Sequence, residues 1–479
     1  MILLNGLNRR VWGTVALLAT YGVLSFVPLP GVQAKQLAGS THGLMTIGIA
    51  TSTSAFVTVE FAALVWPGWR RLRTSRVGRS KLDRAVLILT LMLGLLQVSG
   101  AVLALQHLSD VDPTMAMLQG TAQLLVWLSL YSGLLIAFFM ARAISSFGLF
   151  NGFSVLTLCE GLRPSNLRPD GGSAFPIANW VAHPWLAVCT LVLLVLATVA
   201  CFLPRRAGAD ETNAAPSELP VPASSMQPYA IVVAMLSLPA LLASIFPERK
   251  NALLPWIQVL YENQWPRAVL TAALGMLLLW AFSRASLVRA AYCLVFSPES
   301  ATKLAQRAFR HSVAPTLLFL LALVFSDLAL TRLFDISGIS SVVVTGVAIL
   351  LDFVAAIRLH RSGDWACAWR DPRPYIFPVV QRLLRGSDIA ARELSLAQST
   401  LFRVFAPFVL TEVWVPTERV AQATELIETA FRARSEPPSA LDPIAPEPTP
   451  ELALWRRRRL YVLGALAVLA YALAISAKH

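Results

Sequence analysis

Long apolar runs recur along most of the chain and are separated by short polar or basic segments. A run of about 17 to 25 apolar residues is long enough to cross the hydrocarbon core of a bilayer as a helix. Ten such runs predict membrane-crossing helices, at 11–28, 45–66, 85–105, 115–143, 185–203, 229–247, 268–295, 313–330, 338–357 and 460–476. The first run lacks a small-residue cleavage site, so we expect it to remain as an anchor.

Basic residues between the runs predict the direction of each crossing, because Lys and Arg are enriched on the cytoplasmic side. The segment 69–84 carries six arginines and one lysine, which places the N-terminus in the cytoplasm. Ten crossings alone would leave the basic stretches 284–310 and 358–373 outside. One further crossing at 152–162 corrects both, and this segment is short and polar, so we expect it to lie against protein or water. The C-terminus is then external.

The composition changes after the run 338–357, which is the tenth crossing when 152–162 is counted. Residues 401–415 have a strand-like pattern, and 418–431 have one apolar helical face, which together predict a small cytosolic α/β module. A Pro-rich linker and a final apolar helix with a basic start follow. The predicted parts are a membrane domain over 1–360, the module over 364–435, the linker over 436–455 and a C-terminal transmembrane helix over 456–479.

The composition excludes soluble enzymes, disordered scaffolds and secreted disulfide domains. Hydrophobic residues make up 56% of the chain and charged residues only 14%, and the mean hydropathy is +0.62. The net charge of +13 could indicate nucleic acid, but the basic residues lie mostly beside apolar runs. We therefore expect contact with membrane lipid and no nucleic-acid partner.

Several strings resemble the SecY protein-conducting channel family and occur in the family's order. They are FVPLPG at 26–31, GIATSTSAFVTVEF at 48–61 and a helix-three pattern over 77–100. The most specific is GLLIAFFMARAISSFGLFNGFS at 133–154, whose end matches the family's NGxS turn through Gly148, Asn151, Gly152 and Ser154. Weaker similarities lie at 237–244, 296–304 and 346–353.

The resemblance implies an all-α polytopic membrane fold, with ten helices in two inverted halves around a pore, to which the module and one extra helix are added. The NGxS turn would open a fifth, pore-lining helix, at the place where the charge count requires a crossing. Residues matching the family's pore constriction are Thr53, Val57, Phe153, Thr157, Leu238, Leu241 and, by a looser match, Val343. Two threonines would wet this ring more readily than aliphatic residues do.

The chain also departs from the family. Residues 31–48 leave little room for the family's plug helix, so we expect the plug to be absent or vestigial. The loop 203–228 lacks a basic patch and the loop after Phe296 is short, which argues against docking of a ribosome or motor ATPase. A polypeptide substrate and a small brace subunit are the partners that the resemblance implies. The module resembles small ferredoxin-like signal-transducing domains over 413–427, and a stabilising cap is the favoured interpretation of it.

Two acidic residues lie at predicted membrane depth, where a carboxylate is a candidate for proton or ion coupling. The alternative is solvation in a water-filled vestibule; both interpretations stay open for Glu60, and the vestibule is favoured for Glu160. The hydroxyls of 51–54 could coordinate a ligand, although bonds to carbonyls of their own helix are commoner.

Neither the histidines nor the cysteines have metal-ligand spacing, and phosphate-loop and hydrolase motifs are absent from the sequence. We expect no enzyme activity, metal or cofactor. The sequence favours a divergent SecY-like translocation channel of the plasma membrane, the inner membrane of a bacterium, which passes or laterally releases polypeptide through a central pore. The alternative is a SecY-derived scaffold or regulator whose pore is vestigial and whose cytosolic module carries the function. Small-solute transport is a third hypothesis, and it rests on Glu60 and the polar second helix.

Overall fold

The computed structural model describes most of the membrane helices and most of the module. Described are residues 2–30, 44–66 apart from 46, 76–111, 120–161, 184–200, 264–282, 317–330, 339–362, 364–371, 376–394 and 411–432, with isolated positions elsewhere. Leu238 and Leu241, the linker 436–455 and the helix predicted within 456–479 lie outside these residues.

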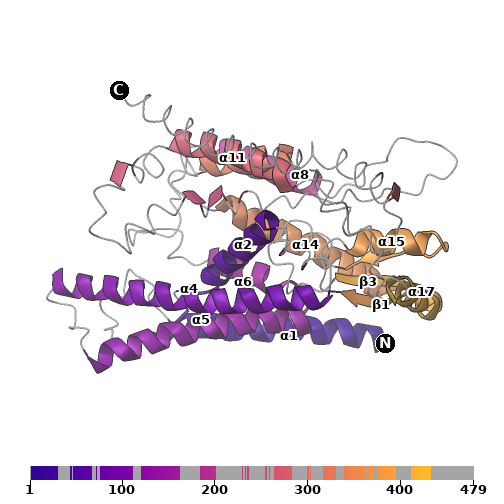
Figure 1. Cartoon of the computed structure of the whole chain (residues 1–479), viewed down its shortest axis with the longest axis horizontal. Coiled ribbons are helices and arrows are strands. Elements are labelled where there is room, and N and C mark those ends of the chain that lie inside the picture. Colours follow the sequence, from indigo (N-terminus) through magenta and orange to yellow (C-terminus); the bar gives the residue numbers. More distant parts are fainter. Residues whose placement is uncertain are drawn as a thin grey trace.

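The apolar runs form helices close to the predicted places (Figure 1). These are α1 (Ile2–Ser25), α2 (Ala50–Val65), α4 (Arg76–Val111), α5 (Thr121–Phe147), α6 (Gly152–Gly161), α8 (Pro184–Ala200), α11 (Gln264–Phe282) and α14 (Ile339–Ser362). A further apolar helix covers Leu317–Leu330. The short polar stretch for which the charge balance required another crossing is therefore helical, as α6.

Three of the described helices are long and apolar enough to cross a membrane, at Gly78–Leu103, Thr121–Phe147 and Ser340–Arg361. Large apolar side chains such as Met92, Leu124 and Leu350 are exposed on them. A water-soluble protein rarely exposes so much apolar surface, whereas a helix that faces lipid must. The chain is a multi-pass membrane protein.

The helices pack in layers around α6. In Figure 1, α1, α4 and α5 lie on one side, α2 and α6 lie in the middle, and α8 and α11 lie on the far side. Helix α6 contacts both α5 and α14, and α14 in turn contacts α8. The apolar core between these layers includes Tyr21, Phe56, Phe138, Phe319 and Val344. A helix of 10 residues rises about 15 Å, which is half of the hydrocarbon thickness.

A small sheet and two helices lie beside the start of α1 and the end of α14 (Figure 1). The strands β1 (Trp365–Asp371), β2 (Arg392–Glu393) and β3 (Thr411–Pro416) are antiparallel in the order β1-β3-β2. Helices α15 (Ile376–Arg385) and α17 (Val420–Arg432) pack against this sheet, and a 3-10 turn, η6 (Thr417–Arg419), precedes α17. We call this unit the module.

Strand β3 is buried on both faces, which explains its apolar sequence. Val413 and Val415 point into the module's own core, where they meet Val380 and Ile427. Because side chains alternate along a strand, the side chains of Glu412 and Trp414 point the opposite way. Trp414 packs there against residues of the membrane helices. The predicted strand and helix patterns thus coincide with β3 and α17, while 401–410 lie outside the described residues.

Candidate functional site

The structure brings three of the expected constriction residues into one hydrophobic cluster. Val57 of α2 and Phe153 of α6 are buried within it, and Val343 of α14 packs against it. The exposed fractions of Val57 and Phe153 are 6% and 0%, so water does not reach the Phe153 side chain. The described part of the site is a filled apolar core at the meeting point of three helices.

Phe153 lies at the centre of an aromatic group. Its ring is 5.0 Å from the ring of Phe56 on α2 and 5.9 Å from the ring of Phe138 on α5, in both cases nearly perpendicular. Edge-to-face pairs of this kind add about 0.5 to 1.5 kcal/mol each beyond the burial of their area. Sequence reasoning missed Phe56 and Phe138, because nothing in the sequence distinguishes them from the other apolar residues of their helices.

The two threonines of the expected ring use their hydroxyl groups locally. The Thr53 hydroxyl donates to the carbonyl oxygen of Ile49 at 3.3 Å, and the Thr157 hydroxyl donates to that of Phe153 at 2.8 Å. Both residues are half-buried. Each hydroxyl proton is therefore engaged within its own helix, which leaves only the oxygen lone pairs to attract water.

The other hydroxyls of 51–54 are also engaged in packing, apart from one. Ser54 donates to the carbonyl oxygen of Ala50, and Thr51 donates to the side chain of Gln97 on α4. Ser52 is buried and its hydroxyl has no hydrogen-bond partner among the residues that the structure describes. These contacts correspond to helix packing, the commoner of the two interpretations of this segment.

The family-like turn between α5 and α6 is shaped by specific hydrogen bonds. The Asn151 side-chain oxygen accepts from the N–H of Phe153 at 3.0 Å and so caps the start of α6. The N–H of Gly152 donates to the Ser145 hydroxyl at 2.9 Å. A Cβ atom on Gly152 would lie 1.9 Å from the Ala141 carbonyl oxygen, so only glycine allows this approach. The turn thus fixes where α6 begins relative to α5.

The other two residues of this motif are also tightly enclosed. Gly148 ends α5, and its N–H donates to the carbonyl oxygen of Ile144 at 2.8 Å. A Cβ atom there would lie 2.6 Å from the Thr14 hydroxyl oxygen of α1. Ser154 is completely buried in the first turn of α6. Every residue of the motif therefore lies where a larger side chain would disturb the packing.

Glu60 is buried and paired, so the solvated vestibule expected as one alternative is wrong for this residue. Its carboxylate lies 3.1 Å from the guanidinium of Arg79, with exposed side-chain fractions of 1% and 0%. Arg79 also lies 3.9 Å from the Asp83 carboxylate. An arginine of the neighbouring helix thus offsets the cost of placing this carboxylate in an apolar region. The pair joins α2 to α4.

Glu160, at the other end of α6, is half-buried and joins three elements instead of only facing water. Its carboxylate accepts from the Tyr21 hydroxyl of α1 at 2.7 Å and from the N–H of Ile49 at the start of α2. Gly48 has φ +48°, and a Cβ atom there would lie 1.9 Å from this carboxylate. A negative charge at the N-terminus of α2 is also favoured by the helix dipole. The favoured vestibule interpretation is therefore incomplete.

The described residues contain no group of three or more His, Cys, Asp or Glu side chains that could hold a metal ion. The carboxylates of Glu60 and Glu160 are engaged across helices, whereas the hydroxyls of Thr53 and Thr157 bond within their own helices. Such an arrangement can seal and orient helices, and three of the seven residues expected at the pore constriction, Val57, Phe153 and Val343, meet in a closed apolar centre.

Comparisons with known proteins place these features in context. No family model matches the chain. Among solved structures, the chain is similar to one described as the structure of a protein conducting channel, with a TM-score of 0.46, 11% identity, and coverage of 72% of this chain and 90% of the other. It is also similar to Sec61 in the canine ribosome-channel complex from the endoplasmic reticulum, with a TM-score of 0.45, 10% identity and the same coverage.

The sequence relationship is more direct. The chain is 26% identical over 204 residues to the protein translocase subunit SecY 2 of Lactobacillus kefiranofaciens subsp. kefiranofaciens, a match that covers 38% of this chain. The matched region is 50% of that protein, so the chain spans about half the length of this curated relative. The match confirms the resemblance to the SecY family that the helix and turn motifs carry in the sequence.

Proposed function

We propose that this protein is a divergent SecY-like channel of the plasma membrane that passes polypeptide through a central pore or releases it sideways into the lipid. The observation that carries the proposal is that Val57, Phe153 and Val343 lie in one cluster, because the family resemblance predicts all three at the pore constriction. The relationship to a subunit named as a protein translocase supports the same function.

The packing around Phe153 supports a channel that is closed at rest. A hydrophobic constriction blocks ions as long as its side chains exclude water. Phe153 is inaccessible to water and contacts aromatic rings of α2 and α5. Opening would have to separate α6 from α2, which removes at least the contact with Phe56. The aromatic group then replaces the plug that the sequence leaves little room for.

We also infer that the module and the N-terminus lie on the cytoplasmic side. The basic ends of two helices meet the module: Arg10 near the start of α1 contacts it, and α14 ends in His360 and Arg361 beside β1. Basic residues at helix ends favour the cytoplasm. A reporter fused at Arg206 should be cytoplasmic and one fused at Lys478 should be external. An external signal at Arg206 would remove the crossing assigned to α6.

A second candidate function is a SecY-derived scaffold or regulator with a vestigial pore that acts through the module. The same filled core is compatible with this alternative. Phe153 is inaccessible to water, as expected of a protein whose pore never opens. The two candidates differ in one measurable property, which is the ion conductance after the core is weakened.

The experiment compares the conductance of variants in planar lipid bilayers. Phe153→Ala removes the central ring of the seal, and we expect more frequent channel openings than in the unmodified protein. Phe325→Ala is the matched control, because Phe325 lies on the helix Leu317–Leu330 and is 52% exposed. Equal silence of the unmodified protein and Phe153→Ala would contradict the channel and favour the scaffold.

A further inference from the structure

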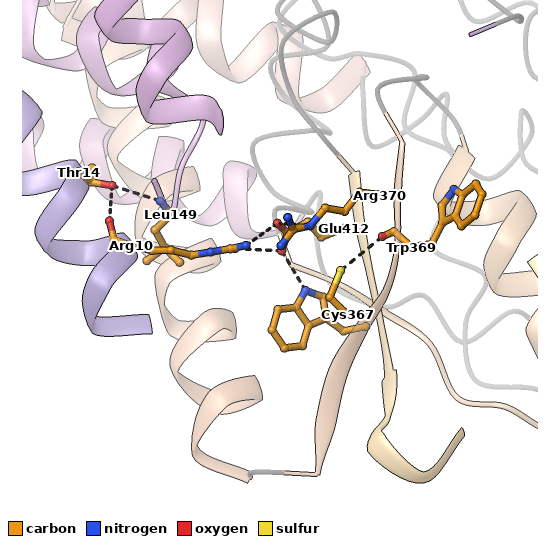
Figure 2. A network of polar contacts seen from close by, with 8 residues as sticks. Arg10, Thr14, Leu149, Cys367, Trp369, Arg370 and Glu412 are labelled. Carbon is orange, nitrogen blue, oxygen red and sulfur yellow. Dashed lines mark hydrogen bonds and ion pairs between the residues drawn. The ribbon is translucent and has the colours of Figure 1, made fainter. Parts of the chain in front are cut away.

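A carboxylate of the module gathers side chains from distant parts of the chain (Figure 2). Both oxygens of Glu412 accept from the Arg10 guanidinium of α1, at 3.0 and 3.1 Å. The Arg370 guanidinium lies 3.2 Å away, and the Trp414 indole N–H donates to the carboxylate at 3.1 Å. We call these four residues the Glu412 clamp. Paired bonds between a guanidinium and a carboxylate are strong and fix the orientation of both groups.

An apolar cluster lies beside the clamp and joins it to α14. Trp414 packs with Leu149, Ala356 and Leu359 in a buried cluster, to which Trp365 and Cys367 of β1 also contribute. The Trp414 ring lies 5.0 Å from the ring of His360. The module is thus attached to the membrane helices through a mixed interface, with an ion pair at its edge and aromatic packing beside it.

The clamp is connected to the start of α6 through two residues of α1 and the turn. Thr14 donates to the carbonyl oxygen of Arg10 at 2.9 Å and accepts from the N–H of Leu149 at 3.2 Å. Leu149 belongs to the same apolar cluster as Trp414, and the ring of its neighbour Phe150 lies 6.0 Å from that of Phe353 on α14. Asn151, which caps α6, follows directly in the chain.

We propose that the module acts as a positioning device for α6, and that Glu412 and Arg10 are its positioning residues. Docked through the Glu412 clamp, the module holds the turn 148–151 between α1 and α14 and thereby sets where α6 begins. Undocking frees this turn and loosens α6. The proposal rests on the proposed function only in treating α6 as a pore helix; the mechanical link is independent of transport.

The interface is suited to reversible docking. The side chains of Arg10 and Glu412 are 23% and 12% exposed, so water and salt reach the ion pair. The module therefore offers a ligand of the cytosol a way to change the start of α6, by competing for Arg10 or for Glu412. An anionic group fits the first site and a guanidinium or amine fits the second.

Two native cysteines allow the docking of the module and the packing of α6 to be measured separately. Cys367 lies in the docking interface, and Cys159 lies in α6 and packs against the central core. Burial raises the pKa of the Cys367 thiol, and the nearby Glu412 carboxylate raises it further, against an opposing effect of Arg370. Because the thiolate is the reactive form, alkylation of Cys367 at pH 8 should be slow while the module is docked.

The experiment measures alkylation rates in two full-length proteins that keep only Cys367 or only Cys159, with serine at the other cysteines. Arg10→Ala removes a clamp residue that lies outside the module, so the module's own residues are unchanged. Each unit by which the thiol pKa falls raises the thiolate fraction about tenfold. We expect a rise of about tenfold at Cys367 and a severalfold rise at Cys159. Arg10→Lys, which keeps the charge but loses the paired geometry, should give intermediate rates.

Arg9→Ala is the matched control, because Arg9 is the neighbouring arginine and is exposed. It should leave both rates unchanged. An unchanged Cys367 rate in Arg10→Ala would show that the clamp does not hold the module. A raised Cys367 rate with an unchanged Cys159 rate would show docking without positioning of α6. Rates equal to those in denaturant would identify Arg10 as a folding residue. Each of these three results overturns the proposal, and none of them depends on conductance.

Discussion

Two arginine–carboxylate pairs join distant elements of this protein, and they differ in both burial and geometry. Glu60 and Arg79 are almost completely buried and share one contact of 3.1 Å between α2 and α4. Glu412 and Arg10 are partly exposed and share two contacts, between the module and α1.

The difference separates a permanent contact from a reversible one. Removing one member of a buried pair leaves an uncompensated charge in an apolar region, which typically costs about 3 to 5 kcal/mol. A pair in contact with water can exchange its partner for solvent at a much smaller cost. We therefore infer that α2 and α4 move as one body, whereas the module and α1 can separate.

The largest expected effect is the loss of the buried pair. Arg79→Leu should lower the free energy of unfolding by about 3 to 5 kcal/mol, because Glu60 then stays buried without a positive charge. Thermal unfolding in detergent micelles measures the change. Lys81→Ala is the control, since Lys81 is exposed in the same turn of α4, and it should have little effect. Equal effects of both substitutions would mean that Glu60 finds other compensation.

A double variant sharpens this result. Glu60→Leu combined with Arg79→Leu removes both charges and fills part of the space with apolar side chains. Replacing a buried ion pair by apolar residues is often neutral or stabilising. The double variant should therefore unfold at a higher temperature than Arg79→Leu alone. A lower unfolding temperature would show that the pair contributes through its shape and not through its charge.

The next effect in size concerns the docked module. Arg10→Ala should weaken docking by about 1 to 3 kcal/mol, because it removes two hydrogen bonds to a charged group whose contribution is reduced by contact with water. The protection of Cys367 from alkylation, relative to denatured protein, gives this free energy. Protection as strong as in the unmodified protein would place the docking energy in the apolar contact alone.

The ionic strength should affect the two ion pairs differently. Raising the ionic strength to about 1 M shortens the Debye length to about 3 Å, which screens exposed charges far more than buried ones. Alkylation of Cys367 should become a few times faster, while the difference in unfolding temperature between Arg79→Leu and the unmodified protein should stay the same. A salt-independent Cys367 rate would contradict reversible docking.

The smallest effect is expected at the outer edge of the clamp. Arg370 contacts Glu412 at 3.2 Å but is 49% exposed. Exposed ion pairs contribute up to about 1 kcal/mol. Arg370→Ala should therefore reduce the protection of Cys367 less than Arg10→Ala does. The reverse order would place the main holding contact inside the module.

The positions of the membrane helices could be predicted from apolar runs, since a membrane imposes a minimum length on each helix. Even α6 could be predicted, from the charge balance of the loops on either side. The roles of single arginines could not be predicted from the sequence. Arg9 and Arg10 are adjacent and chemically identical in the sequence, yet of these two it is Arg10 that contacts Glu412, which lies 402 residues away.

The same limit applies to the candidate site. Phe153 could be identified through the turn motif, because the motif fixes its place in α6. Phe56 and Phe138, which surround it, have no such marker. Glu160 was recognised as unusual, but its bonds to Tyr21 and Ile49 depend on how three separate elements meet in space. Sequence patterns of one element do not contain that information.

The Glu412 clamp also has a consequence for the order of biosynthesis. Glu412 is made 402 residues after Arg10. At about 5 to 20 residues per second, this interval lasts roughly 20 to 80 s. During that time α1 and the turn before α6 lack their contact with the module. The nascent chain can therefore dock the module only after the helices from α1 to α14 have been synthesised.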